Sequence, residues 1–324
     1  MRERLFPRQV LIVLGIFAGA AFLIGLIGAF IRSDGVGNAI LSGLEASILA
    51  FIGGLLARSF ISFLLWLGKD SDNVGLVLGW AFFLWPGVFD TVARFFGKQW
   101  LTKPAVLLWI ATSVGAFTGM MDGMWQTHNW IGVGVPAFVL DETWGLVGST
   151  NGDLLHLFDF AGGDHVVGET RTDAHRYNEG FAFKSGFAFT QGAVMSSNND
   201  ALGTPLFAHE NTHVWQNRLF GPIFTLSYLA WMVIFLIPGL IWGLASGDGP
   251  GVGIESWCYY NNPWETWGYA VGESEGATPR TTRAPGIWSD LAVWLVSIPF
   301  FLLFLFLAGW RVVYRIWSRA RAGT

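Results

Sequence analysis

Long apolar segments are the dominant feature of this chain. Residues 9–31, 38–67 and 104–121 are close to or longer than the roughly 20 apolar residues that cross a bilayer as one helix. A similar segment, residues 291–310, stands near the C-terminus. We therefore expect a multi-pass membrane protein, mostly an α-helical transmembrane bundle.

Two further apolar segments are interrupted. Residues 73–89 are short and contain a Pro-Gly step at 86–87, and residues 219–247 contain another at 238–239. Proline removes a backbone donor and clashes with the preceding turn, so it kinks or ends a helix. We expect residues 73–89 to be a re-entrant segment, and residues 219–247 to form a membrane-inserted hairpin that turns at 238–239.

The region between these segments, residues 122–285, differs in texture. Up to residue 218 it contains clusters of Gly, Asn, Asp and Thr and no long apolar run. Within residues 180–195, phenylalanines alternate with Gly and Ala, and this period of two predicts short strands with one buried face. We therefore expect an inserted α+β domain between the membrane regions 1–121 and 286–324.

Composition and charge agree with a membrane protein. Charged residues make up 13% of the 324 residues, about half the usual share of about 25% in soluble domains. This value excludes a wholly soluble protein, and the single cysteine excludes an intrachain disulfide and a multi-cysteine metal site. Residues 122–221 carry four Lys/Arg and eleven Asp/Glu, so nucleic acid is not an expected partner.

One motif carries specific chemistry. Residues 209–213 read His-Glu-Asn-Thr-His on a predicted helix that Thr204 can cap. Histidines at i and i+4 project from one face of a helix, so both can bind one zinc ion. The glutamate after the first histidine can take a proton from the water that zinc activates. The pattern predicts two ligands and a general base, respectively His209, His213 and Glu210.

A catalytic zinc needs a third protein ligand. Downstream, Asn262 and Pro263 can begin a second helix that carries Glu265 in its first turn. Glu265 is the predicted third ligand, although the same position suits a capping-box glutamate that binds no metal. The alternative ligands are His156, His165, His175, Glu255 and Glu273.

The two segments that carry the predicted ligands resemble a known protein family. The segment AHENTHVWQNRLFGPIF resembles the HExxH helix of zincin-like metallopeptidase domains, and YYNNPWETWGYA resembles their second ligand helix. The resemblance covers roughly residues 180–272. It implies a gluzincin site in which Zn²⁺ is held by His209, His213 and Glu265, with Glu210 as the base.

The resemblance also implies that the strand before the motif lines the substrate cleft, here through Phe187, Phe189 and Gln191. Two departures stand out. Residues 211–212 are Asn-Thr instead of aliphatic and small residues, and position 270 is Ala instead of an aspartate that orients the ligand helix. Site-2-type proteases also combine HExxH with membrane segments, but they require a downstream aspartate in an apolar helix, for which Asp290 is a poor match. Prenyl-protein proteases look closer, because they place membrane segments between HExxH and the ligand glutamate, but they lack the NPWE segment.

Three functions are compatible with these features. The first is a membrane-bound zinc metallopeptidase that cleaves a membrane or membrane-proximal polypeptide, with Tyr259 or Tyr260 stabilising the oxyanion. The second is a catalytically silent zinc-binding subunit of a membrane complex, for which the 18 tryptophans and a GxxxG step at 15–19 provide lipid and helix contacts. The third is a transporter whose polar path contains Glu45, Arg58 and Asp90.

Arginines orient the chain. They precede the first span and follow residues 291–310, and Lys/Arg concentrate on the cytoplasmic side of a membrane, so both termini are expected there. Zinc–ligand bonds are about 2 Å and the hydrocarbon core about 30 Å thick. His213 and Glu265 must therefore share one side, and residues 219–247 between them must not cross. If residues 73–89 do not cross, an odd number of spans precedes the zinc domain, and we expect it on the extracytoplasmic side of a bacterial inner membrane. The alternative is four crossings, which would put the zinc domain in the cytoplasm and the arginine tail outside.

Overall fold

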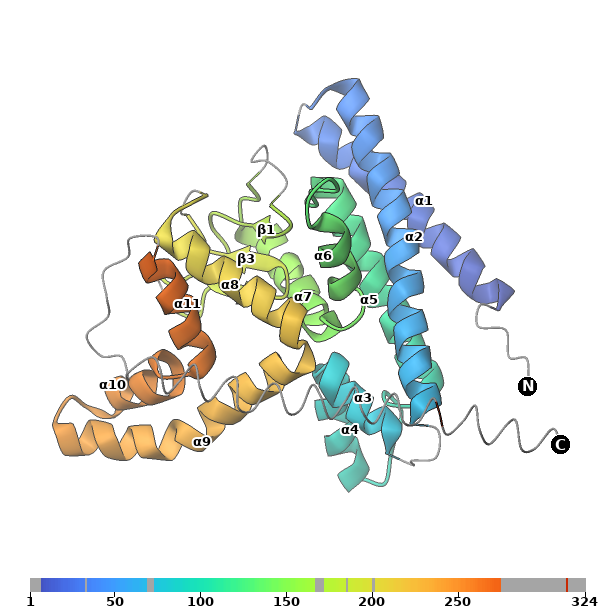
Figure 1. The fold of residues 1–324 in the computed structure, drawn as a ribbon. Helices are drawn as coiled ribbons and strands as arrows, with labels where there is room; N and C mark the ends of the chain where they lie inside the picture. Colours follow the sequence, from blue (N-terminus) through green and yellow to red (C-terminus); the bar gives the residue numbers. More distant parts are fainter. Residues whose placement is uncertain are drawn as a thin grey trace.

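The computed structural model describes most of the chain, namely residues 7–32, 34–68, 73–166, 172–184, 186–199, 202–274 and position 313. Its elements run in the order shown in Figure 1, from α1 near the N-terminus to α11. The expected last span, residues 291–310, lies outside the described residues.

Three long helices form one side of the molecule, as Figure 1 shows: α1 (Arg8–Ile31), α2 (Gly35–Leu67) and α5 (Pro104–Trp125). Each is long and apolar enough to cross a membrane, as is α9 (Pro222–Ser246) farther along the chain. Small side chains fill the contacts between the three helices, and large apolar side chains remain exposed on their outer faces. The described part of the chain is therefore that of a mostly helical membrane protein.

Glycines set the close approach of α2 and α5. A Cβ on Gly53 would lie 2.3 Å from the carbonyl oxygen of Gly115, and one on Gly119 would lie 2.2 Å from the backbone of α2. By contrast, a Cβ on Gly15 or Gly19 would have no atom within 4 Å. The GxxxG step of α1 therefore makes no close contact with the described helices.

Residues 73–89 belong to two short helices, α3 (Val74–Phe82) and α4 (Trp85–Phe95). The break precedes Pro86, at Leu84, whose φ is 57°. Pro86 stands in the first turn of α4, where a missing N–H costs no helical hydrogen bond. At 1.5 Å per residue, α4 is about 17 Å long, so neither helix alone spans a hydrocarbon core of about 30 Å.

The next two helices pack against this bundle. They are α6 (Gly134–Asp141) and α7 (Leu146–Gly162). Leu146 shares a buried core with residues of α2, α3 and α5. The hydroxyl of Thr118 on α5 donates to Asp153 on α7 at 2.9 Å. The region after α5 therefore lies beside the bundle, in contact with its middle.

A small sheet follows α7. Its order is β1 (His175–Arg176), β3 (Val194–Ser196), β2 (Phe189–Gln191); β3 is parallel to β1 and antiparallel to β2. The strands are shorter than the alternation over 180–195 predicts. Two glycines with positive φ interrupt the first half of that segment, Gly180 and Gly186.

The last described part contains α8 (Pro205–Phe220), α9, α10 (Pro250–Glu255), the π-helix η1 (Ser256–Tyr260) and α11 (Pro263–Ser274). Thr204 caps α8, accepting from the backbone N–H of Phe207. The return leg, α10 and η1, runs back along α9, where the indole of Trp231 donates to the carbonyl of Trp257 at 3.0 Å. In this way α11 is brought beside α8 (Figure 1).

The chain reversal after α9 is not at the expected position. α9 continues through Pro238, and the turn lies at Gly247 and Gly249, both with positive φ. Proline removes only one helical hydrogen bond, whereas the return leg packs closely on Gly239 and Gly243, where a Cβ would lie 2.8 Å and 2.3 Å from backbone carbonyl oxygens. This packing keeps the helix continuous across the proline, so the predicted turn at 238–239 was wrong.

Candidate metal centre

Helix α8 presents two histidines on one face. His209 and His213 are one turn apart and both are buried. Their Nε2 atoms are 3.1 Å apart, so both rings turn the same nitrogen toward one point. Because α8 is capped by Thr204 and continues without interruption to Phe220, the helix itself sets the relative positions of the two histidines.

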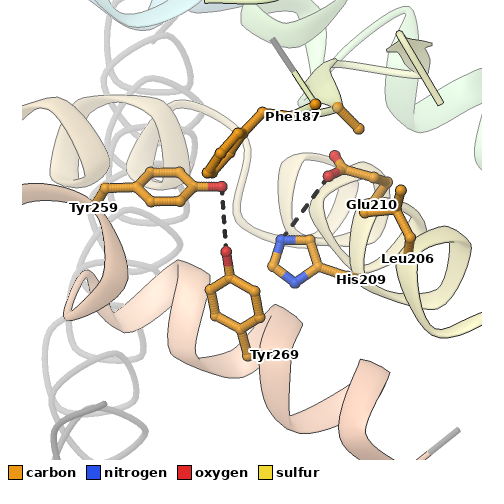
Figure 2. Close-up of a pocket in the computed structure, with 8 residues that line it drawn as sticks. Phe187, Leu206, His209, Glu210, Tyr259 and Tyr269 are labelled. Carbon is orange, nitrogen blue, oxygen red and sulfur yellow. Dashed lines mark hydrogen bonds and ion pairs between the residues drawn. The ribbon is translucent and has the colours of Figure 1, made fainter. Parts of the chain in front are cut away.

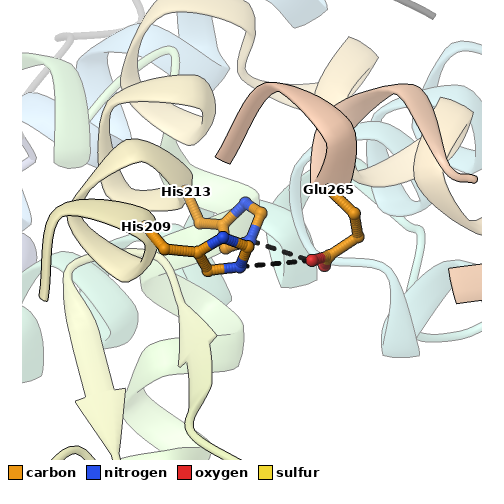
Figure 3. A group of neighbouring side chains, drawn as sticks. All are labelled: His209, His213 and Glu265. Carbon is orange, nitrogen blue, oxygen red and sulfur yellow. Dashed lines mark hydrogen bonds and ion pairs between the residues drawn. The ribbon is translucent and has the colours of Figure 1, made fainter. Parts of the chain in front are cut away.

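Helix α11 delivers a carboxylate to the same point (Figure 3). Glu265 Oε2 lies 3.2 Å from Nε2 of His209, and Oε1 lies 3.4 Å from Nε2 of His213. Glu265 is buried and stands in the first turn of α11. The capping-box alternative is excluded by its hydrogen bonds, because the N–H of Asn262 is bonded to the carbonyl of Tyr259 instead.

These distances fit a tetrahedral ion. Ligand atoms about 2.0–2.1 Å from a zinc ion, at tetrahedral angles, are roughly 3.3 Å from one another. The three observed separations, 3.1, 3.2 and 3.4 Å, lie around this value. One carboxylate oxygen, Oε2 of Glu265, and Nδ1 of His209 have no hydrogen-bond partner among the described residues. The group can hold a metal ion, and two nitrogens with one carboxylate are a ligand set that zinc accepts.

A glutamine fixes the second histidine. Nδ1 of His213 lies 2.8 Å from Oε1 of Gln216, and the Gln216 amide donates to the carbonyl of Trp264 at 3.0 Å. Because its NH₂ group is engaged by Trp264, Gln216 turns its oxygen to His213, which must then carry its proton on Nδ1. Nε2 is left with a lone pair for a metal, and α8 is tied to the residue before Glu265.

Protons and a metal ion compete for this group. Burial lowers the pKa of His213, but the Glu265 carboxylate outweighs burial and raises it to about 9. Burial raises the pKa of Glu265, yet the two imidazoles hold it well below its usual range. Binding a metal must displace the proton between them, so the affinity for metal falls as the pH falls.

Glu210 stands beside the metal ligands and is not one of them. Its Oε1 is 4.0 Å from Nε2 of His209, and its Oε2 accepts a 2.5 Å hydrogen bond from Thr190 on β2. The carboxylate is buried. This position beside the ligand group suits a base that receives a proton from a water molecule.

A cavity opens at this point (Figure 2). It encloses about 320 Å³, counted with its open mouth, and is lined by Gly186, Phe187, Ala188, Leu206, His209, Glu210, Tyr259 and Tyr269. Phe187 lies on one side and Tyr259 faces it, with ring centres 6.1 Å apart. The cavity therefore connects the candidate ligands and base with the segment before β2.

Only one of the three residues expected to line the substrate cleft lines the cavity. Phe187 lines the cavity, but Phe189 and Gln191 are not among the residues that line it. Phe189 packs on Phe181 instead, with ring centres 5.5 Å apart. Since side chains alternate along a strand, Thr190 between them is the residue of β2 that points to Glu210.

Tyrosines surround the ligand carboxylate. Tyr259 lines the cavity, and burial together with Glu265 raises its pKa, so its hydroxyl stays protonated and can donate. Tyr260 donates to Glu255 at 3.2 Å. Tyr269 follows Glu265 by four residues on α11, a spacing that could have identified it. Its hydroxyl is 3.5 Å from that of Tyr259.

Two further contacts could not be found from sequence spacing. The hydroxyl of Tyr228 on α9 donates to Oε1 of Glu265 at 2.7 Å, across 37 residues. Gly268 on α11 leaves room for an imidazole, because a Cβ there would lie 2.9 Å from the ring of His209. Both depend on how α9 and α11 pack on α8.

The alternative ligands lie elsewhere. His156 bonds to Tyr177, and His165 and His175 contact each other at 3.1 Å, away from α8. Glu255 forms an ion pair with Lys184 at 2.7 Å, and the side chain of Glu273 lies outside the described part of the structure.

The charges of the transporter hypothesis have separate partners. Glu45 accepts from the indole of Trp130 at 2.7 Å. Arg58 donates to Thr112 and to a backbone carbonyl of α5. Asp90 accepts hydrogen bonds within the turn that follows α4. The three residues have different partners in different parts of the structure, so they do not mark one polar path.

Known proteins give no further guide to the site. No protein family, curated protein or solved structure matches this chain. The resemblance to zincins therefore stands on the motif and on the geometry of His209, His213 and Glu265 alone.

Proposed function

We propose that this protein is a membrane-bound zinc metallopeptidase with a zincin-like domain. The observation that carries the proposal is the convergence of three buried residues beside a carboxylate that is not a ligand: the two histidine Nε2 atoms are 3.1 Å apart, and the two oxygens of Glu265 lie 3.2 and 3.4 Å from one Nε2 each. His209, His213 and Glu265 would hold the ion. Zinc bound there would lower the pKa of a water molecule and polarise a substrate carbonyl.

The chain's own residues supply the proton transfers. Glu210 takes a proton from the attacking water and returns it to the leaving amine, because its Oε1 faces the ligand group and the cavity. Thr190 holds the other oxygen and so fixes the carboxylate plane. Tyr259 and Tyr269 line the opposite wall, where either hydroxyl can donate to the oxygen that becomes negative.

A membrane polypeptide is the substrate that the surroundings favour. Tyr228, which bonds the ligand Glu265, is four residues before Met232, the first of three consecutive exposed apolar side chains on α9. Four helical residues cover about 6 Å. The site is thus close to a surface that suits lipid, and it would act on a peptide bond in or near the membrane.

The fold also supports the proposed topology. The return leg along α9 leaves His213 and Glu265 at the same end of the hairpin, as ligands of one ion require. We propose that α1, α2 and α5 cross a bacterial inner membrane and that α9 does not; with a cytoplasmic N-terminus, the zinc domain would then face the extracytoplasmic side. Asn199 is exposed, whereas the native Cys258 is buried. In a Cys258→Ser background, Asn199→Cys should react with an impermeant maleimide on intact spheroplasts; reaction only after permeabilisation contradicts this placement.

The decisive experiment separates zinc binding from cleavage. His213→Ala should lose the zinc that the purified protein holds, at about one ion per chain. Glu210→Gln should keep zinc and lose hydrolysis, since an amide cannot act as a base. Asn211→Ala, on the same helix and outside the cavity lining, is the control. Profiling of new protein N-termini in cells should show products with wild type and Asn211→Ala that are absent with Glu210→Gln. Identical profiles contradict a peptidase.

A second function is favoured by the narrow cavity. Two aromatic rings that line the cavity, Phe187 and Tyr259, have their centres 6.1 Å apart. A site narrowed in this way suits a zinc-binding accessory subunit of a membrane complex that performs no hydrolysis. In that case Glu210→Gln returns a deletion strain to the wild-type phenotype, and His213→Ala does not.

A further inference from the structure

A carboxyl group lies inside the bundle, at the crossing of α2 and α5. Glu142 directly follows α6 and is fully buried. A Cβ on Gly53 would lie 2.6 Å from its Oε1, and one on Gly115 would lie 2.7 Å from its Oε2. These glycines stand near the middle of two helices long enough to span a membrane. The carboxyl therefore lies at the depth where an ionisable group is most costly.

Nothing in the described structure compensates a charge on this group. Neither oxygen of Glu142 has a hydrogen-bond partner. Asp90, equally buried, shows the contrast: it accepts from the backbone N–H groups of Trp100 and Leu101 at 2.9 and 3.1 Å, and from Thr102 and Arg94. A buried carboxylate is stable with such partners, whereas one without them takes up a proton.

The neighbouring acidic groups also favour the protonated form of Glu142. The carboxyls of Asp122 on α5, Asp141 on α6 and Asp153 on α7 all oppose a negative charge on Glu142. The cation on α2, Arg58, is directed to the carbonyl of Leu108 and to Thr112. Burial and the three neighbouring acids thus disfavour the ionised form of Glu142.

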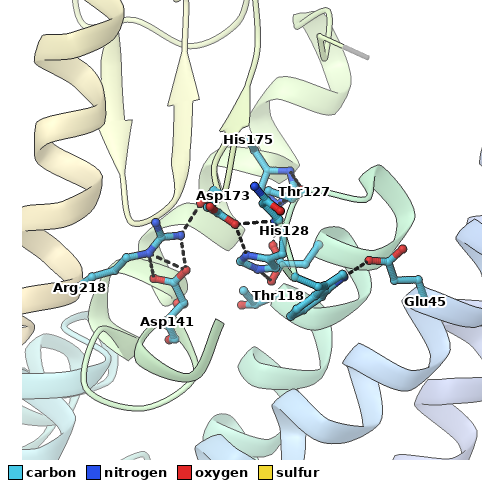
Figure 4. A network of polar contacts seen from close by, with 12 residues as sticks. Glu45, Thr118, Thr127, His128, Asp141, Asp173, His175 and Arg218 are labelled. Atoms are coloured by element: carbon cyan, nitrogen blue, oxygen red, sulfur yellow. Dashed lines mark hydrogen bonds and ion pairs between the residues drawn. The ribbon is translucent and has the colours of Figure 1, made fainter. Parts of the chain in front are cut away.

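One face of α5 leads from this carboxyl toward the surface. Thr118 and Asp122 follow Gly115 by three and seven residues, a spacing that places them on one helix face. Thr118 donates to Asp153. Oδ1 of Asp122 lies 2.9 Å from Nε2 of His175. Figure 4 shows Thr118 and His175 in this part of the structure.

The row then continues to the edge of the molecule. Nδ1 of His175 lies 3.1 Å from Nε2 of His165, which is partly exposed. Carboxyl, hydroxyl and imidazole groups all exchange protons. Groups of these kinds therefore stand along this side of α5, from the partly exposed His165 to the acids around Glu142.

We propose that Glu142 is a proton-binding site within the membrane bundle, filled from the surface along this face of α5. The ligand is a proton, and the site is separate from the metal centre. The proposal does not depend on peptidase activity.

Infrared spectroscopy of the purified full-length protein in lipid tests the proposal. At neutral pH, wild type minus Glu142→Gln should show the carbonyl stretch of a protonated carboxyl, and heavy water should shift that band. Asp90→Asn is the matched control, because the difference spectrum should contain only carboxylate bands. Labelling with carbon-13 glutamate should shift the same protonated band in the wild type, which shows without any variant that the band comes from a glutamate.

Three results overturn the proposal. One is a Glu142→Gln difference that contains only carboxylate bands. Another is a protonated band that heavy water never shifts, since that carboxyl is sealed and binds no proton from solvent. The third is a protonated band that sodium ions replace with a carboxylate band, which identifies a cation site. If Glu142→Gln fails to fold, absence of a carbon-13-sensitive protonated band in the wild type is equally decisive.

Discussion

Gln216 offers the sharpest test of the metal centre, because it touches His213 and no other ligand. Gln216→Ala removes the acceptor of the 2.8 Å hydrogen bond from Nδ1 of His213 and the donor to the carbonyl of Trp264. The histidine then loses the contact that fixes its tautomer and ring orientation. The link between α8 and the α11 segment that carries Glu265 is also lost.

The expected size of the effect follows from this geometry. Partners of metal-binding histidines typically contribute 10–100-fold to affinity, which corresponds to about 1.4–2.7 kcal/mol. Gln216 is 1% exposed, so water cannot easily replace its hydrogen bonds. We expect the affinity for zinc to fall by about 10–100-fold, without loss of the fold.

Competition with a chromophoric zinc chelator measures this affinity. Asn217→Ala is the matched control: Asn217 is the next residue, is equally buried, and donates to the carbonyl of Gly145 at 3.2 Å instead of to a ligand. It should destabilise the protein and leave zinc affinity unchanged. Equal zinc affinity in Gln216→Ala and wild type would refute the assignment of Gln216 as the residue that orients His213.

Three further predictions address the fold and the site. Burial lowers the pKa of His128, but its carboxylate contacts outweigh burial and raise the pKa from 6.5 to about 9. The protonated histidine therefore stabilises the fold fully below pH 6.5, and this stabilisation is lost as the pH rises through 9. The melting temperature of His128→Gln should lack this decline with pH. Gly119→Ala should lower the melting temperature, whereas Gly19→Ala should not, because only the first Cβ meets backbone atoms; equal shifts would contradict the packing. Tyr228→Phe, which removes the hydrogen bond to Glu265, should weaken zinc binding in the same chelator assay, and an unchanged affinity would show that the contact is dispensable.

What the sequence by itself determined is local. Apolar segments of membrane length predicted α1, α2 and α5, because about 20 apolar residues in a row have few other stable environments. The cap at Thr204 predicted the start of α8, and the i, i+4 spacing predicted that His209 and His213 would share a face. Both properties are set within one helix and need no knowledge of its neighbours.

Tertiary structure decided everything that depends on contacts between elements. The sequence left Glu265 open between a cap and a ligand, and the packing of α11 on α8 turned it to the histidines. The turn after α9 was misplaced because the packing of the return leg on two glycines outweighs a helix-interior proline. Glu142 falls within residues 122–285, the expected inserted domain, and no motif singles it out. Only the crossing of α2 and α5 places its carboxyl between two glycines, since side chains far apart in sequence are brought together by packing and not by period.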